Sequence, residues 1–142
     1  MNITTLALPI LAVSLCVAAA APAHAEKMTM KVNLTGASEV PPNDSPGKGV
    51  ADIGFDTATK FLTWKVTYAG LTGPATAAHF HGPAEPGKNA PVMIPFKDAA
   101  SGAQGNATLT DAQAADLTAG RYYVNVHTAA HPGGEIRGQV TK

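Results

Sequence analysis

Four histidines in the second half of the chain are the residues best suited to chemistry. His79 and His81 are separated by one residue, within a run that has the alternation of a β-strand. Because side chains two positions apart point to the same face of a strand, we expect the two imidazoles side by side, about 7 Å apart. His127 ends a second strand-like run, and His131 follows shortly after it. Since imidazole is the commonest metal ligand in proteins, this pattern predicts a mononuclear site formed by His79, His81 and His127, with His131 as a further candidate ligand.

Copper is the metal that we expect at this site, with zinc as the runner-up. Nitrogen ligands bind copper(II) most tightly among the divalent first-row ions, whereas three imidazoles also suit zinc. A copper ion held there would serve copper buffering or transfer, or one-electron chemistry at an open coordination position. For transfer, the expected partner is another exported copper protein. No Gly-x-Ser-x-Gly motif or phosphate-binding loop is present, so the sequence gives no support to a hydrolase.

Three polar residues near the last two histidines are candidates for supporting roles. Asn125 lies between apolar residues but faces the ligand side, and we expect it to hydrogen-bond beside the ligands. Glu135 and Arg137 alternate with Ile136 and therefore share a face. A supporting role would be a hydrogen bond to an imidazole for Glu135 and attraction of an anion for Arg137. The alternative is that both are exposed strand residues.

The segments that must position these residues read as short strands separated by glycine and proline. Thr110 and Gln113 have the spacing of a capping box, and Gly120 closes the Ala-rich segment that follows, which predicts one short helix. The pattern as a whole predicts an all-β domain, a single antiparallel sandwich or barrel of about eight strands. The expected strands are residues 28–34, 50–56, 61–68, 76–81, 91–96, 104–109, 121–127 and 134–140.

Strand alternation also predicts on which side of the sheet the candidate ligands lie. Residues 122, 124 and 126 are apolar and share one face, whereas His127 belongs to the opposite face with Asn125. In the same way, Phe80 points away from its histidine neighbours. The site is therefore expected on the outside of the barrel. It would lie beneath the proline-rich loop of residues 82–91, provided that the strands at 76–81 and 121–127 are neighbours.

The N-terminal segment resembles a secretory signal peptide. Residues 6–21 are almost wholly apolar and are followed by Ala23-His24-Ala25, a pattern of small residues typical of a cleavage site. We therefore expect residues 1–25 to be removed and residues 26–142 to form one domain in the periplasm or outside the cell. The single cysteine, Cys16, lies in the removed part, so the domain has no disulfide. Its ten basic and ten acidic residues balance, and no basic run indicates nucleic acid or a membrane as a partner. The oligomeric state stays open.

Five sequence blocks in residues 26–142 resemble the CHRD domain, a family named after chordin. The resemblance implies an extracellular domain found in animal signalling antagonists and in secreted bacterial proteins. It also supports an alternative function, a protein-interaction or matrix module without a metal. The blocks are Leu34-Thr-Gly-Ala-Ser-Glu-Val-Pro-Pro42, Ala77-Ala-His-Phe-His-Gly-Pro83, Leu109-Thr-Asp-Ala-Gln113, Tyr123-Val-Asn-Val-His-Thr128 and Pro132-Gly-Gly-Glu-Ile-Arg-Gly-Gln139.

A fainter resemblance is to the copper site of copper-zinc superoxide dismutases. It rests on His79-Phe-His81, Val124-Asn-Val-His127 and Gly134-Glu-Ile-Arg137-Gly, in this order. The resemblance implies a Greek-key barrel with His79, His81 and His127 as copper ligands and Arg137 as the group that guides an anion to the metal. No histidine lies between His81 and His127, so the bridging imidazole and the zinc subsite of that family have no counterpart. Any enzyme of this kind would be a copper-only superoxide dismutase.

Overall fold

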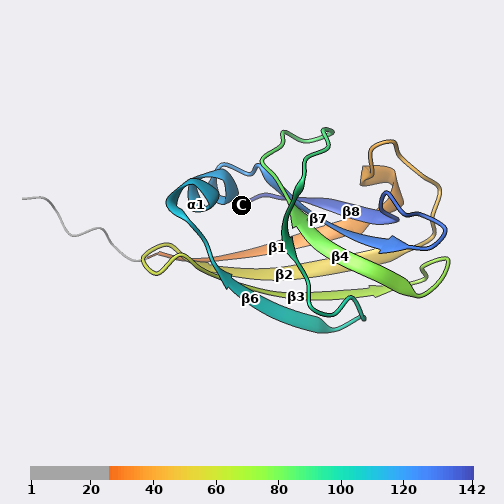
Figure 1. Ribbon diagram of the computed structural model, residues 1–142, viewed down its shortest axis with the longest axis horizontal. Coiled ribbons are helices and arrows are strands. Elements are labelled where there is room, and N and C mark those ends of the chain that lie inside the picture. The colour runs from red at the N-terminus through yellow and green to blue at the C-terminus, as the bar shows by residue number, and fades with distance from the viewer. Residues whose placement is uncertain (1–25) are drawn as a thin grey trace, which may run out of the picture.

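The computed structural model describes residues 26–142, which form one antiparallel sheet curled into a nearly closed barrel (Figure 1). Around the barrel the strands follow the order β5-β4-β7-β8-β1-β2-β3-β6, so that β5 and β6 form the two edges. The expected all-β class, antiparallel architecture and single short helix are confirmed, whereas the signal peptide prediction lies outside the described residues. The elements are β1 (Lys27–Thr35), η1 (Gly36–Ser38), β2 (Lys48–Asp56), β3 (Phe61–Ala69), β4 (Ala75–His81), β5 (Val92–Pro95), β6 (Ala103–Thr108), α1 (Asp111–Thr118), β7 (Tyr122–Thr128) and β8 (Ile136–Val140).

Two connections cross the barrel and bring distant segments together. The strands β1, β2 and β3 follow one another as neighbours, but β6 returns to lie beside β3, and β7 lies beside β4. This is the connectivity of a Greek key, in which a strand returns by a long connection to pair with an earlier one. The crossing places the two strands that carry the candidate ligands next to each other.

The barrel interior is apolar because each strand alternates as the sequence predicts. Along β1, residues 28, 30, 32 and 34 are buried while their neighbours are exposed, and β3 follows the same pattern. Trp64 lies near the open side of the barrel, with its ring 5.2 Å from that of Phe80 and 4.9 Å from that of Phe96. These contacts join β3, β4 and the segment after β5, and so fill the space between the two edge strands.

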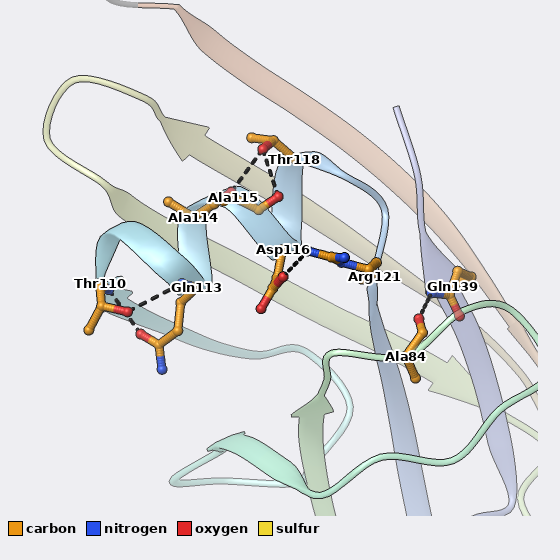
Figure 2. Close-up of polar contacts among 9 residues, drawn as sticks. All are labelled: Ala84, Thr110, Gln113, Ala114, Ala115, Asp116, Thr118, Arg121 and Gln139. Carbon is orange, nitrogen blue, oxygen red and sulfur yellow. Dashed lines mark hydrogen bonds and ion pairs between the residues drawn. The ribbon is translucent and has the colours of Figure 1, made fainter.

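The helix α1 lies at one end of the barrel, beside the C-terminus (Figure 1). Its capping box forms as predicted, since Thr110 accepts from the backbone of Gln113 while the Gln113 side chain accepts from the backbone of Thr110 (Figure 2). Leu117 is its one buried residue, and Gly120 follows with a φ of +74°. The helix therefore closes this end of the barrel. Among residues 26–142, no helix has the length and apolar character needed to cross a bilayer.

Candidate metal centre

The strands β4 and β7 are antiparallel neighbours, which is the condition that the predicted site required. In their register His79 is opposite Asn125, His81 is opposite Tyr123, and His127 is opposite Ala77. All three histidines point to the outer face of the barrel, because Phe80 and Val126 occupy its interior. Pairing of the two strands therefore brings together side chains that lie far apart in the sequence.

The three imidazoles form one compact cluster. His79 Nδ1 lies 3.1 Å from His127 Nε2, and one nitrogen from each ring can be chosen so that all three lie within 4.8 Å of one another. Two nitrogens bound to one ion at about 2.1 Å can be at most about 4.2 Å apart, so small side-chain rotations suffice to enclose an ion. His79, His81 and His127 are thus brought together as predicted.

Two backbone carbonyl groups determine which nitrogen of each ring is free. The Nδ1 of His81 lies 3.0 Å from the carbonyl oxygen of Ala90, and the Nδ1 of His127 lies 2.9 Å from that of Pro132. Since a carbonyl oxygen can only accept a hydrogen bond, each Nδ1 carries a proton. The Nε2 of each neutral ring then has an unshared electron pair, which is the state that metal binding requires.

Burial keeps the imidazoles of His79 and His81 neutral. His81 is 8% exposed, and His79 is partly buried. Removal from water, followed by the charges of His127 and His81, lowers the pKa of His79 to about 4. Burial also lowers the pKa of His81, against the opposing effect of its hydrogen bonds to Ala90 and Asn125. Protons therefore compete weakly with a metal ion at these two rings near neutral pH.

His131, the fourth candidate ligand, does not belong to the cluster, which contains three histidines among the described residues. Its backbone instead closes the turn after β7, with the His131 N–H donating to the Thr128 carbonyl oxygen at 3.1 Å. The Gly134 N–H in turn donates to the His131 carbonyl oxygen at 3.0 Å. The turn thus places His131 apart from the three ligand positions, although it follows His127 closely in sequence.

Glu135 is fully buried but makes none of its hydrogen bonds with an imidazole, in contrast to the predicted contact. Its carboxylate accepts from Ser45 Oγ at 2.6 Å, from Thr128 Oγ1 at 2.6 Å, and from both the N–H and the Oγ1 of Thr72 at 2.7 and 2.8 Å. Burial alone would raise the pKa of Glu135, but these hydrogen bonds outweigh it and lower the pKa to about 2. Glu135 therefore joins three loop and strand segments as a buried anion.

Arg137 is 2% exposed and is held by the loop of residues 82–91. Its Nη1 donates to Asn89 Oδ1 at 2.9 Å and its Nη2 donates to the Lys88 carbonyl oxygen at 2.6 Å. The guanidinium lies 3.4 Å from the centroid of the Tyr123 ring, which in turn stacks on His81 at 4.7 Å. The side chain thus contacts the site through Tyr123. The exposed position that was the alternative for Glu135 and Arg137 is excluded by their burial.

The loop of residues 82–91 covers the outer face of β4, β7 and β8 and is attached by side chains from all three strands. His81 contacts the Ala90 carbonyl oxygen, and the Tyr123 hydroxyl lies within 3.3 Å of both backbone polar atoms of Ala90. Gln139 Nε2 donates to the Ala84 carbonyl oxygen at 3.1 Å (Figure 2). The roof predicted over the histidines is therefore present, and it is fixed by hydrogen bonds.

Glu39 is a buried residue near the site that the sequence did not single out. It is 5% exposed, and burial raises its pKa to about 7, against the lowering effects of Arg137, the Val40 backbone and the Asn125 amide. Its Oε1 accepts no hydrogen bond from the described residues. Glu39 and Arg137 both line a cavity of about 480 Å³ between the η1 segment and the loop of residues 82–91. A lone glutamate in a proline-rich segment has no periodicity that could have predicted this position.

Comparison with known protein families agrees with this architecture. The model of the CHRD domain family matches residues 30–140, and the chain therefore belongs to this family. CHRD domains are extracellular or secreted modules. No curated protein and no solved structure matches the chain. The family thus defines the class of the protein, and the histidine cluster is the feature from which its chemistry must be argued.

Proposed function

We propose that this CHRD domain is exported to the periplasm or the cell exterior and binds one copper ion through His79, His81 and His127. The observation that carries the proposal is the pair of carbonyl groups that hold protons on the Nδ1 atoms of His81 and His127. Both Nε2 atoms are left free to bind a cation, beside His79 Nδ1. A neutral all-imidazole cluster suits copper first and zinc second.

Copper buffering or transfer is the use that the surroundings of the site support best. Superoxide dismutation would need Arg137 to guide the anion to the metal, as the resemblance to superoxide dismutases implies. Its guanidinium would then have to attract an anion from solvent. Here two Arg137 nitrogens donate to the loop of residues 82–91, and the acidic residue Glu39 lines the same cavity. Both features weaken the attraction of an anion. We therefore favour a carrier, whose partner would be another exported copper protein, over an enzyme.

Metal titration tests the proposal directly. The protein, expressed with its N-terminal segment intact and then purified, is expected to bind one equivalent of copper more tightly than micromolar. His127→Ala and His79→Ala should each abolish stoichiometric binding, whereas the matched control His131→Ala should bind as the unaltered protein does. Preferential retention of zinc would favour the zinc-binding alternative.

The competing function is an extracellular interaction or matrix module, which family membership alone supports. Weak or absent binding of both ions by the intact protein would favour that alternative and contradict a metal site. If copper does bind, consumption of superoxide by the loaded protein at a rate near the diffusion limit would identify an enzyme, and its absence would support a carrier.

A further inference from the structure

Asn125 contributes the oxygen atom that lies closest to two of the three ligand nitrogens. Its Oδ1 is 2.9 Å from His81 Nε2 and 2.9 Å from His127 Nε2. Two donors that bind one ion at about 2.0–2.2 Å are separated by about 2.9 Å at a right angle and by about 3.4 Å in a tetrahedron. The Oδ1 atom therefore has the spacing of a ligand, as do His79 Nδ1 and His127 Nε2 at 3.1 Å.

Hydrogen bonding accounts for the 3.1 Å between His79 Nδ1 and His127 Nε2, if His79 Nδ1 carries the proton, but not for the two short distances to Asn125 Oδ1. The protons of His81 and His127 are on Nδ1, where the Ala90 and Pro132 carbonyl groups accept them. Both Nε2 atoms therefore present unshared electron pairs, and so does the carbonyl oxygen of Asn125. Three acceptors converge without a proton between them. A cation at their centre would turn this mutual repulsion into attraction.

The opposite orientation of the Asn125 amide would satisfy both imidazoles, because its two N–H groups could donate to the two Nε2 atoms. Glu39 favours the observed orientation instead. The Asn125 Nδ2 and Glu39 Oε1 lie together over Gly134, where a Cβ would collide with both of them. Gly134 also has a φ of +125°, in the region that favours glycine. A buried carboxyl group beside the amide nitrogen directs the amide oxygen toward the histidines.

We propose that Asn125 Oδ1 is the fourth ligand of the metal centre and that Glu39 is the positioning residue that turns this oxygen toward the ion. The inference rests on the metal site proposed above and completes its donor set as three imidazole nitrogens and one amide oxygen. All four donors are neutral. The same four donors can take copper(II) or zinc, and copper is the ion to test.

Substitutions of Asn125 and Glu39 separate these roles. With copper(II) alone as the probe, Asn125→Leu should weaken binding about tenfold or more and change the electron paramagnetic resonance spectrum, because an oxygen ligand is lost. Asn125→Asp keeps an oxygen at the same place and should retain tight binding. Glu39→Gln should weaken binding about tenfold, since residues that orient ligands typically have effects of this size. The matched control is Glu135→Gln, a buried carboxyl group bonded to hydroxyls away from the site, which should leave copper affinity unchanged.

The results distinguish failure of this inference from failure of the proposed function. An unchanged affinity and spectrum in Asn125→Leu, together with loss of binding in His127→Ala, would overturn the fourth ligand alone. Absence of tight copper binding in the intact protein would overturn both proposals. If Asn125→Leu does not fold, as judged by circular dichroism, Glu39→Gln decides. Wild-type affinity and an unchanged spectrum in that variant would contradict the positioning role and, with it, the inference.

Discussion

The two faces of strand β7 are both buried, but by different means. Tyr122, Val124 and Val126 point inward and are 0% exposed among the apolar side chains of the barrel. On the outer face, Asn125 and His127 are 2% and 9% exposed, although they are polar. His127 contacts the backbone carbonyl group of Pro132 in a loop, and Asn125 lies against the imidazoles of His81 and His127. The inner face is thus stabilised by close packing and the outer face by directional hydrogen bonds.

This difference indicates where stability and chemistry reside in the fold. Apolar packing depends on side-chain volume and not on any particular donor or acceptor. Removing a packed side chain leaves a cavity, which lowers stability. The outer layer depends on individual polar atoms, and removing one leaves its partners unpaired. We therefore expect substitutions on the inner face to reduce stability most and substitutions on the outer face to alter ion binding and pH dependence.

The largest effect is expected for Phe80→Ala on the inner face. Phe80 is 0% exposed and its ring lies 5.2 Å from that of Trp64 and 5.4 Å from that of Phe96. Truncation of such a residue leaves a cavity and should lower the free energy of unfolding by about 3–5 kcal/mol. Urea denaturation measures the change. A loss below about 1 kcal/mol would contradict the distinction between the two faces.

A smaller loss is expected for Glu135→Ala, which removes a buried anion beyond the site. The hydroxyls of Ser45, Thr72 and Thr128 would lose their acceptor, at a cost of about 2–4 kcal/mol. Because the folded-state pKa of about 2 is below the ordinary value of 4.5, the contribution of Glu135 is present above pH 4.5 and declines as the pH falls toward 2. Denaturation curves across this range should show the decline in the wild type and not in the variant.

Glu39 should give the free energy of unfolding the opposite dependence on pH, and Glu39→Gln should remove it. The folded-state pKa of about 7 exceeds the ordinary value of 4.5, so folding favours the protonated carboxyl group. Its contribution is fully present below pH 4.5 and is lost as the pH rises to about 7. In the metal-free wild type the free energy of unfolding should therefore fall by about 1–3 kcal/mol between pH 4.5 and about 7. This fall should be absent in Glu39→Gln. Equal slopes for both proteins would show that Glu39 is not desolvated.

Copper retention on acidification tests His79. With a pKa of about 4 instead of 6.5, His79 should keep its ligand nitrogen unprotonated well below pH 6. We expect bound copper to be released only as the pH approaches about 4, as followed by the absorbance of a copper chelator. Half-release near pH 6.5 would indicate that the ring is hydrated as in a peptide.

The smallest effect is expected where the outer face has no covering loop. Lys31 and Asp52 pair at 3.6 Å across β1 and β2, with side chains that are 71% and 56% exposed. Exposed pairs of this kind contribute little because water screens them. Asp52→Asn should leave the denaturation midpoint unchanged, and a clear shift would mean that this outer surface is stabilised like that of β7.

Much of the barrel follows from local sequence, because alternation and turn residues act over short distances. The strand at 61–68 and the capping box at Thr110 were predicted almost to the residue, since Trp64 and its neighbours alternate strictly and the cap needs two residues three positions apart. The pairing of β4 with β7 could only be stated as a condition. It depends on connections that cross the barrel, and strand alternation contains no information about them.

Within the site, the sequence predicted the three histidines but not the atoms that arrange them. The i, i+2 spacing of His79 and His81 is sufficient to place both rings on one face. By contrast, the carbonyl group of Ala90 and the carboxyl group of Glu39 reach the site from loops whose paths the sequence pattern does not encode. The same cause explains Glu135, which the turn after β7 directs toward Ser45 and Thr72 instead of toward an imidazole.

The carbonyl groups of Ala90 and Pro132, which hold the protons of His81 and His127 on Nδ1, both belong to loops and not to the barrel. When either loop lifts in the metal-free protein, the proton on Nδ1 is free to relocate to Nε2, and that Nε2 no longer presents an electron pair to the site. Closure of these loops therefore readies the metal-free site for an ion, and loop motions in proteins take nanoseconds to microseconds.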